Sequence, residues 1–240
     1  KMLLYLLSNI GDYHYRFPSM YTKIEQIISN YKKEITKGIS KTDIFKIFNK
    51  NKLMLLFLFE EDLITPDEKI AFLFTTDEYK MNFYPHYFLK EFKSFFDEKF
   101  IKKINSETNK IFEHKEISEK TPEAFERNRK NGVNEDILCQ LIRNDSLQQF
   151  KSYLKRMHMP QSCVIKLSIF ESNPFLSAKK VSLIEYAAFY GSIEIFKYLK
   201  ENQIELTPNL WIFAVHSQNI KLIQFLEEND VKPPNNSFDD

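Results

Sequence analysis

The stretch SLIEYAAFYGSI, residues 182–193, decides how the chain folds, because a similar stretch follows it at a fixed distance. A shift of 27 places, from Leu183 to Leu210, aligns residues of the same kind over about two short helices. The further aligned pairs are Tyr186 with Phe213, Ala187 with Ala214, Ala188 with Val215, Ile193 with Ile220, Ile195 with Leu222, Tyr198 with Phe225, Leu199 with Leu226 and Asn202 with Asn229. The sequence therefore predicts an internal repeat.

Each copy of the repeat predicts a short helix, a tight turn and a longer helix. The small pairs Ala187-Ala188 and Ala214-Val215 let neighbouring helices approach closely, while the second helix buries its apolar face. A third, weaker copy lies 46 places upstream and matches Ala187, Ala188, Gly191-Ser192-Ile193 and Phe196 with Leu141, Ile142, Asp145-Ser146-Leu147 and Phe150. We expect three helix pairs to stack side by side.

This pattern resembles the ankyrin repeat, Thr-Pro-Leu-His-x-Ala-Ala-x-x-Gly-His followed by an apolar second helix. Ser182 stands at the capping Thr, Glu185 at the His and Gly191 at the turn Gly. The second copy has Gln218-Asn219 in place of that Gly. The spacing is shorter than the roughly 33 residues of ankyrin repeats, and the Gly-Ala-Asp-type turn is absent. The resemblance therefore implies shortened hairpins and binding through the concave face of the first helices.

The aromatic- and Asn-rich repeats are more specifically similar to divergent ankyrin-repeat proteins of parasitic protists, which carry an uncharacterised domain before their repeats. We predict an all-α fold with a helical domain of unknown function at 1–118, a polar connection at 119–133 and an ankyrin-like α-solenoid at 134–240. The best copies of the repeat are 181–206 and 207–232.

Helix signals also recur outside the best copies. Thr65-Pro66-Asp67-Glu68 has the pattern of an N-cap followed by Pro and a Glu that reaches back, and the same device is expected at Thr121-Pro122, Ser182–Glu185 and Thr207-Pro208. Helical spacing of aromatic residues predicts one amphipathic helix through Phe88, Phe92, Phe95, Phe96 and Phe100. The apolar run 53–59 is too short for a bilayer span and predicts a buried helix face. Alternating runs joined by Gly turns are missing, so strands should be scarce.

Glycine is scarce, with 4 residues in 240. Because no two glycines lie within five residues of each other, neither a dinucleotide-binding fingerprint nor a Walker loop can be formed. Turns that need a positive φ should be few or carried by Asn, and Asn202, Asn219 and Asn229 lie at the expected places.

Charge and cysteine usage limit the partners. The net charge is +1, so the chain as a whole has no field that attracts nucleic acid or an anionic membrane, and we predict neither nucleic-acid binding nor membrane insertion. Cys139 and Cys163 lack metal-ligand spacing and indicate core residues in a reducing compartment, which predicts a cytoplasmic, intracellular protein. The apolar helix with Leu222 and Leu226 has no following repeat, so we expect the native chain to extend beyond residue 240.

Catalytic chemistry finds little support in the sequence. The five histidines are scattered, and none forms the paired spacing of a zinc hydrolase. The histidine with the most suggestive surroundings, His86, is better interpreted as partly buried and satisfied than as catalytic. A strained Gly-x-Ser-x-Gly turn is absent. We therefore predict no enzyme activity and no catalytic, cofactor-binding or metal-binding residues.

The function predicted is a non-catalytic protein-interaction module or scaffold whose partner, a protein of unknown identity, binds the concave face of the first helices. The residues that the resemblance implies for this contact are Glu185, Phe189, Tyr190, His216 and Ser217. Packing onto the next repeat is an equally good role for Tyr190, and Trp211 is better interpreted as core. The alternative is an enzyme or enzyme regulator whose active part lies in the N-terminal domain or outside this chain.

Overall fold

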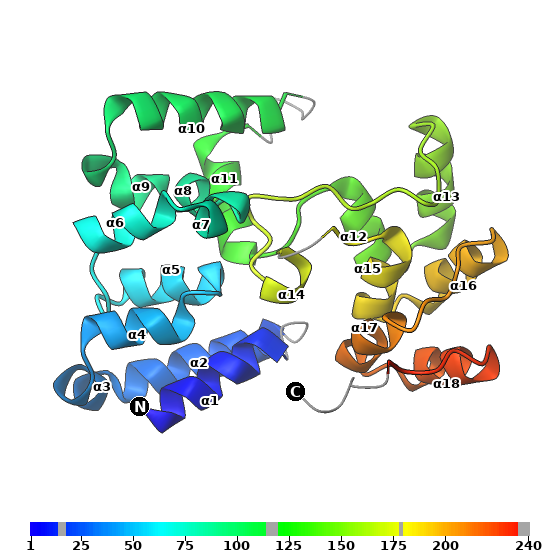
Figure 1. Ribbon diagram of the computed structural model, residues 1–240, viewed down its shortest axis with the longest axis horizontal. Helices are drawn as coiled ribbons and strands as arrows, with labels where there is room; N and C mark the ends of the chain where they lie inside the picture. Colours follow the sequence, from blue (N-terminus) through cyan, green and yellow to red (C-terminus); the bar gives the residue numbers. More distant parts are fainter. Residues whose placement is uncertain (14–17, 114–119, 178–179, 235–240) are drawn as a thin grey trace. The chain divides into compact units, whose positions relative to one another are not determined.

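The computed structural model describes residues 1–13, 18–113, 120–177 and 180–234, and these residues form helices joined by short connections (Figure 1). Within that part of the chain there is no β-strand, and the one β-type pairing is an isolated antiparallel bridge between Val164 and Ser182. The predicted all-α class is confirmed. Helices are favoured because apolar residues recur at steps of three and four between capping residues.

The chain divides into two compact units. Unit 1 comprises Lys1–Asn134 and Ser168–Ala178, and unit 2 comprises Glu135–Leu167 and Lys179–Asp240. The assignment of Ser168–Ala178 to unit 1 is a feature that the repeat pattern does not indicate.

Unit 1 contains the helices of the first half of the chain and one short helix from the returning segment. They are α1 (Met2–Tyr13), α2 (Pro18–Asn30), α3 (Lys32–Gly38), α4 (Lys41–Phe48), α5 (Lys52–Glu60), α6 (Glu68–Phe74), α7 (Asp77–Met81), α8 (Tyr84–Tyr87), α9 (Leu89–Phe92), the 3-10 helix η1 (Lys93–Phe95), α10 (Glu98–Ile111), α11 (Pro122–Asn131) and α14 (Pro174–Ser177).

Aromatic rings fill the core of unit 1. The Phe74 ring stacks on Phe88 with centroids 5.3 Å apart and meets Phe92 edge-on at 4.9 Å. Phe59 in turn contacts both Phe88 and Phe92. Phe74, Phe88 and Phe92 are fully buried, so these aromatic residues serve the packing of unit 1.

The predicted single helix through Phe88 and Phe100 is wrong. The structure breaks this stretch into α8, α9, η1 and α10. Phe88 ends α8 with non-helical backbone angles, and Asp97 begins α10 by accepting a hydrogen bond from the Phe100 amide. Across these breaks the Phe92 ring still stacks on Phe96, and the Phe96 ring meets Phe100 edge-on.

Two of the four predicted helix starts are confirmed. Thr121 caps α11, and Ser182 forms a capping box with Glu185 at the start of the helix that follows it. The other two helices begin two residues later than predicted, with Asp67 and Asn209 rather than the preceding Thr at the N-cap. Asp67 accepts the Ile70 amide at 2.8 Å, and so takes over the role assigned to Thr65.

Buried charge holds parts of unit 1 together. Lys52, 2% exposed, donates through Nζ to the backbone oxygens of Asn82 at 3.1 Å and Ile169 at 2.7 Å. The same Nζ lies 5.3 Å from the centroid of the Tyr87 ring. One side chain thus ties α5 to the segment before α8 and to the returning segment Ser168–Ala178.

A second buried cation, Arg129, anchors α11. It is 1% exposed, and its guanidinium contacts both oxygens of Glu91, at 3.0 and 2.9 Å, and Glu126 at 2.9 Å. The Tyr87 hydroxyl donates to the Arg129 backbone oxygen. This stretch, predicted to be a polar connection, is therefore packed into unit 1 by a paired charge.

Among the described residues, positive φ values are carried by residues other than Asn. They occur at Asp62, Phe83, Asp145, His158, Gln203, Gln218 and Asp230, and at Gly132 and Gly191. Asn202, Asn219 and Asn229 have negative φ, between −89° and −100°, so the expectation that Asn replaces Gly at these turns is wrong. In the turns after Asn202 and Asn229 it is the following residue that adopts the left-handed conformation.

Candidate protein-binding surface

The helices of unit 2 in the described part of the chain form three pairs. The first helices are α12 (Ile137–Arg143), α15 (Leu183–Tyr190) and α17 (Leu210–Ser217), and their partners are α13 (Leu147–Arg156), α16 (Ile193–Glu201) and α18 (Ile220–Glu228). The first helices contact one another in the order α12, α15, α17, and α13 contacts α16 (Figure 1). Ala187, Ala188 and Ala214 are fully buried, as the close approach of α15 and α17 requires.

The turn inside each pair follows the repeat spacing. Asp145, Gly191 and Gln218, which are 46 and 27 places apart, all have positive φ, at 48°, 69° and 51°. Hydrogen bonds join successive turns: the Ser192 hydroxyl donates to the Ile142 oxygen, and the Asn219 amide donates to the Gly191 oxygen. The turns therefore stack in register.

Asp145 also links two helix pairs directly. Its carboxylate accepts the backbone amides of Glu194 and Ile195, each at 3.0 Å, at the start of α16. The turn of the first pair thus caps the second helix of the next pair. This contact uses amides that no residue of α16 itself can satisfy.

A row of side chains crosses the three first helices near their C-terminal ends. The repeat offsets place Arg143, Phe189 and His216 at the same position of α12, α15 and α17. The Phe189 and His216 rings have centroids 5.5 Å apart at 38°, and the Arg143 guanidinium lies 5.9 Å from the centroid of Tyr190. Tyr190 in turn lies 5.1 Å from Phe189. We call Arg143, Phe189, Tyr190 and His216 the first-helix row.

Arg143 keeps its charge in this row. Its Nη1 donates to the Tyr186 hydroxyl at 2.9 Å. Burial acts to lower the pKa of Arg143, but the neighbouring Tyr186 and Tyr190 raise it above the ordinary value. A half-buried cation held beside two tyrosines can meet an anionic group of a partner.

The five residues predicted for binding differ in their exposure to solvent and in their hydrogen bonds. Phe189 and Ser217 are buried, at 2% and 0% exposed, and the Ser217 hydroxyl donates to the Ala214 oxygen. Glu185 is half-buried, and its Oε2 accepts both the amide and the hydroxyl of Ser182. Tyr190 and His216 are half-buried at the ends of their helices. The structure brings Phe189, Tyr190 and His216 together in one row.

Arg143 is the residue of the row that the sequence reasoning missed. The weaker upstream copy, shifted by 46 places, already aligns it with Phe189. Because one residue is an arginine and the other a phenylalanine, the sequence comparison did not single out this pair. Trp211 is 9% exposed and donates to the Val231 oxygen, in agreement with its interpretation as core.

The chemistry available elsewhere in unit 2 is limited. Cys139 and Cys163 form no disulfide, and burial raises the pKa of the Cys163 thiol. Leu222 and Leu226 of α18 are fully buried.

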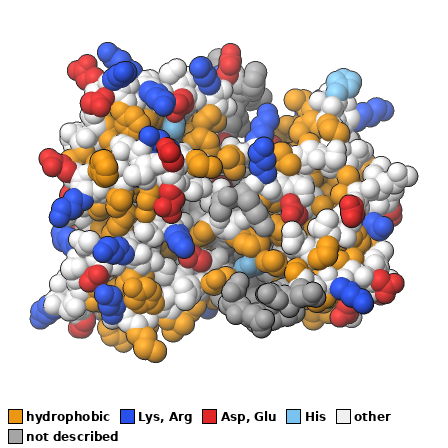
Figure 2. Space-filling view, viewed as in Figure 1, with side chains coloured by type: hydrophobic (Ala, Val, Ile, Leu, Met, Phe, Trp, Pro, Cys, Tyr) orange, Lys and Arg blue, Asp and Glu red, His pale blue; other side chains and the backbone are white. Residues whose placement is uncertain are grey.

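Three observations concern the described residues of the whole chain. Among them, no group of three or more His, Cys, Asp and Glu side chains is placed to hold a metal ion. None of their helices combines the length and apolarity that crossing a bilayer demands. On the face shown in Figure 2, charges of both signs are interspersed with apolar patches.

Comparisons with protein-family models, with curated proteins and with solved structures found no match for this chain. The resemblance to ankyrin repeats therefore rests on the sequence pattern.

Proposed function

We propose that this chain is a non-catalytic protein-interaction module of the ankyrin-like type, which binds a protein partner through the first helices of unit 2. The proposal includes an intracellular location, based on two cysteines that form no disulfide. The observation that carries it is the first-helix row, in which the half-buried Arg143, Tyr190 and His216 are linked through contacts with Tyr190 and with the buried Phe189 ring.

The row has the composition of a binding surface. Tyr190 and His216 offer aromatic area with few rotatable bonds, and Tyr and Arg are enriched among residues that dominate binding energy. Phe189 lies beneath them and fixes the His216 ring by direct contact. A rigid aromatic surface loses little conformational entropy when a partner binds.

Arg143 adds a charge at one end of the row. Because the guanidinium is half-buried and touches tyrosine rings, it is less hydrated than a free surface cation. A carboxylate of the partner would gain a charge-assisted hydrogen bond there. We therefore expect a partner with an acidic residue beside an apolar one.

Site-specific photo-cross-linking tests this proposal. A benzophenone amino acid replaces Tyr190 or His216 in one set of proteins, and Lys197 or Glu201, exposed on α16, in the control set. We expect adducts with one distinct protein from positions 190 and 216 and none from 197 and 201. Adducts formed only from the α16 positions would refute the proposed surface.

The alternative function, an enzyme or enzyme regulator, predicts a different response. A thermal-shift screen with metal ions and nucleotides separates the two, because a ligand that binds only the folded state raises the midpoint. Reproducible stabilisation by one of these small molecules would count against a pure interaction module.

A further inference from the structure

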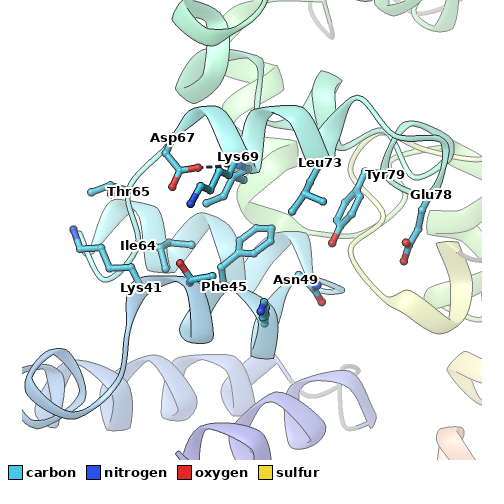
Figure 3. Close-up of a pocket in the computed structure, with 13 residues that line it drawn as sticks. Lys41, Phe45, Asn49, Ile64, Thr65, Asp67, Lys69, Leu73, Glu78 and Tyr79 are labelled. Carbon is cyan, nitrogen blue, oxygen red and sulfur yellow. Dashed lines mark hydrogen bonds between the residues drawn. The ribbon is translucent and has the colours of Figure 1, made fainter.

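Unit 1 has a groove between α4 and α6 that belongs to no part of the first-helix row. Its volume is about 310 Å³, at the lower end of the range for ligand pockets, roughly 300–1,000 Å³. In Figure 3, Lys41 and Thr65 lie toward one end and Tyr79 and Glu78 toward the other.

The floor of the groove is apolar. Phe45 of α4, Ile64 of the connection before α6 and Ile70 of α6 line it, and each is buried, at 3%, 1% and 7% exposed. Leu73 of α6 also lines the groove, and at 37% exposed it adds accessible apolar surface. An accessible leucine on the wall of an apolar groove favours a partner with apolar side chains of its own.

Lysines stand on both sides of this floor. Lys41 and Lys46 come from α4 and Lys69 from α6, all three exposed. Within the part of the chain that the structure describes, none of them forms a salt bridge. Their ammonium groups are therefore available to an anionic ligand.

The acidic side chains of the lining only partly offset these lysines. Asp67 is engaged as the N-cap of α6, accepting the Ile70 amide. Glu78 lies toward the Tyr79 end of the groove (Figure 3). Burial raises the pKa of Tyr79, so its phenol remains a neutral donor there. The complementary ligand is apolar along its centre and acidic along its edges.

We propose that this groove binds an acidic amphipathic peptide segment of a partner protein, with its leucine or phenylalanine side chains on Phe45, Ile64 and Ile70 and its carboxylates beside Lys46 and Lys69. Apolar side chains at helical spacing in a groove, flanked by matched charge, are a common mode of peptide recognition. This site extends the proposed function and does not depend on it, because its residues lie in unit 1.

The test uses a fluorescein-labelled peptide of about 14 residues with Leu and Phe at every third or fourth position and Glu between them. A control peptide has Lys in place of each Glu. Fluorescence anisotropy with the full chain is expected to show saturable binding of the acidic peptide with a Kd on the order of tens of micromolar. Binding is expected to weaken at about 0.5 M salt, because the lysines are exposed and screened.

Three variants locate the site. Lys46→Glu combined with Lys69→Glu should weaken binding by about tenfold or more, because like charges then face the peptide. The matched control, Lys23→Glu with Lys33→Glu, makes the same change in net charge at exposed positions of α2 and α3 and should leave the affinity within about twofold. Leu73→Ser, at a partly exposed position, should weaken binding without unfolding unit 1.

Several outcomes would overturn the proposal. They are equal binding of the acidic and basic peptides, equal effects of the two double variants, and no binding of the acidic peptide. A further one is binding only to phosphatidylserine vesicles, which would assign the groove to a membrane surface.

Discussion

The Phe189 and His216 rings lie 5.5 Å apart although the residues belong to different helix pairs. They occupy the same position of successive copies, 27 places apart, so the repeat itself brings them together. The same register places Arg143 at the equivalent position of α12. A row across the first helices is therefore a consequence of stacking, because the side chains at this position come from neighbouring helices.

Replacing Asp145 tests the link between helix pairs. Asp145→Ala removes the cap on the Glu194 and Ile195 amides and places Ala at a positive φ, so unit 2 should lose about 1–3 kcal/mol of unfolding free energy. Trp211, the one tryptophan of the chain, reports the unfolding of unit 2 by fluorescence in urea.

The matched variant is Asp145→Asn. Asn adopts a positive φ more readily than Ala and keeps one side-chain oxygen as acceptor, so its loss should be smaller. If the two variants had equal midpoints, Asp145 would not link the pairs through this cap.

The sequence predicted unit 2 best, and the reason is physical. Each repeat specifies its own helix pair and its contacts with the next copy, so Ala187 and Ala214 could be assigned to the close helix contact from spacing alone. Arg143 was missed because the first copy has diverged in residue type. The left-handed residues were also missed, because Gln203 and Gln218 adopt a conformation that no propensity assigns to Gln.

Lys52 should stabilise unit 1 far more than an ordinary surface lysine. Lys52→Met leaves the Asn82 and Ile169 oxygens without this donor in a buried site, and should cost about 2–4 kcal/mol. The neighbouring exposed Lys50 provides the control, since Lys50→Met should change stability by less than about 0.5 kcal/mol. Urea unfolding followed by far-ultraviolet circular dichroism compares the two, and equal midpoints would contradict the role of Lys52.

His86 should make unit 1 less stable at acidic pH. Burial lowers the pKa of His86 in the folded chain, against the opposing effect of Glu107, which contacts its Nε2 at 3.1 Å, while nearby Lys52 and Lys103 lower it further. In the unfolded chain the pKa returns to 6.5, so the unfolded state takes up the proton first. The stabilisation is therefore complete above this pH and is lost as the pH falls toward the folded pKa.

Urea midpoints measured between about pH 7.5 and 5.5 test this titration. His86→Gln, which retains hydrogen-bonding groups, should show a smaller fall than the unaltered chain. The control Lys99→Gln, at an exposed position of α10, removes no group that titrates in this range and should show the same fall as the unaltered chain. An unchanged pH dependence in His86→Gln would assign the titration to another group.

Replacing either of two glycines with alanine should change the stability of the chain, but in opposite directions. At Gly132, where φ is 66°, a Cβ would lie 2.9 Å from Leu53 Cδ2, so Gly132→Ala should cost about 1–3 kcal/mol. At Gly38, the last residue of α3, a Cβ would meet open space, and Gly38→Ala should stabilise by about 0.4–1 kcal/mol. Thermal unfolding by circular dichroism distinguishes the signs, and two shifts of the same sign would contradict this account.

Unit 1 was less predictable because long-range contacts decide its details. Helical periodicity located the apolar faces, but it did not locate the breaks between α8 and α10, a stretch in which Phe88 and Phe92 pack on Phe59 and Phe74 of other helices. Residues Ser168–Ala178 belong to this unit through Lys52 and through Phe170, whose ring stacks on Phe112 at 6.0 Å. A buried lysine and a returning segment leave no local signal, since their partners lie far away in the sequence.

The affinity of the partner for Tyr190→Ala tests the central claim most directly. The partner identified by cross-linking is titrated into the unaltered chain, Tyr190→Ala and the control Tyr153→Ala, which removes a half-buried tyrosine from α13 in the same unit. Removing a central aromatic contact should raise Kd about tenfold or more, while the control should stay within about twofold. Equal affinities for the two variants, with the Trp211 unfolding midpoints unchanged, would show that the partner does not bind the first-helix row.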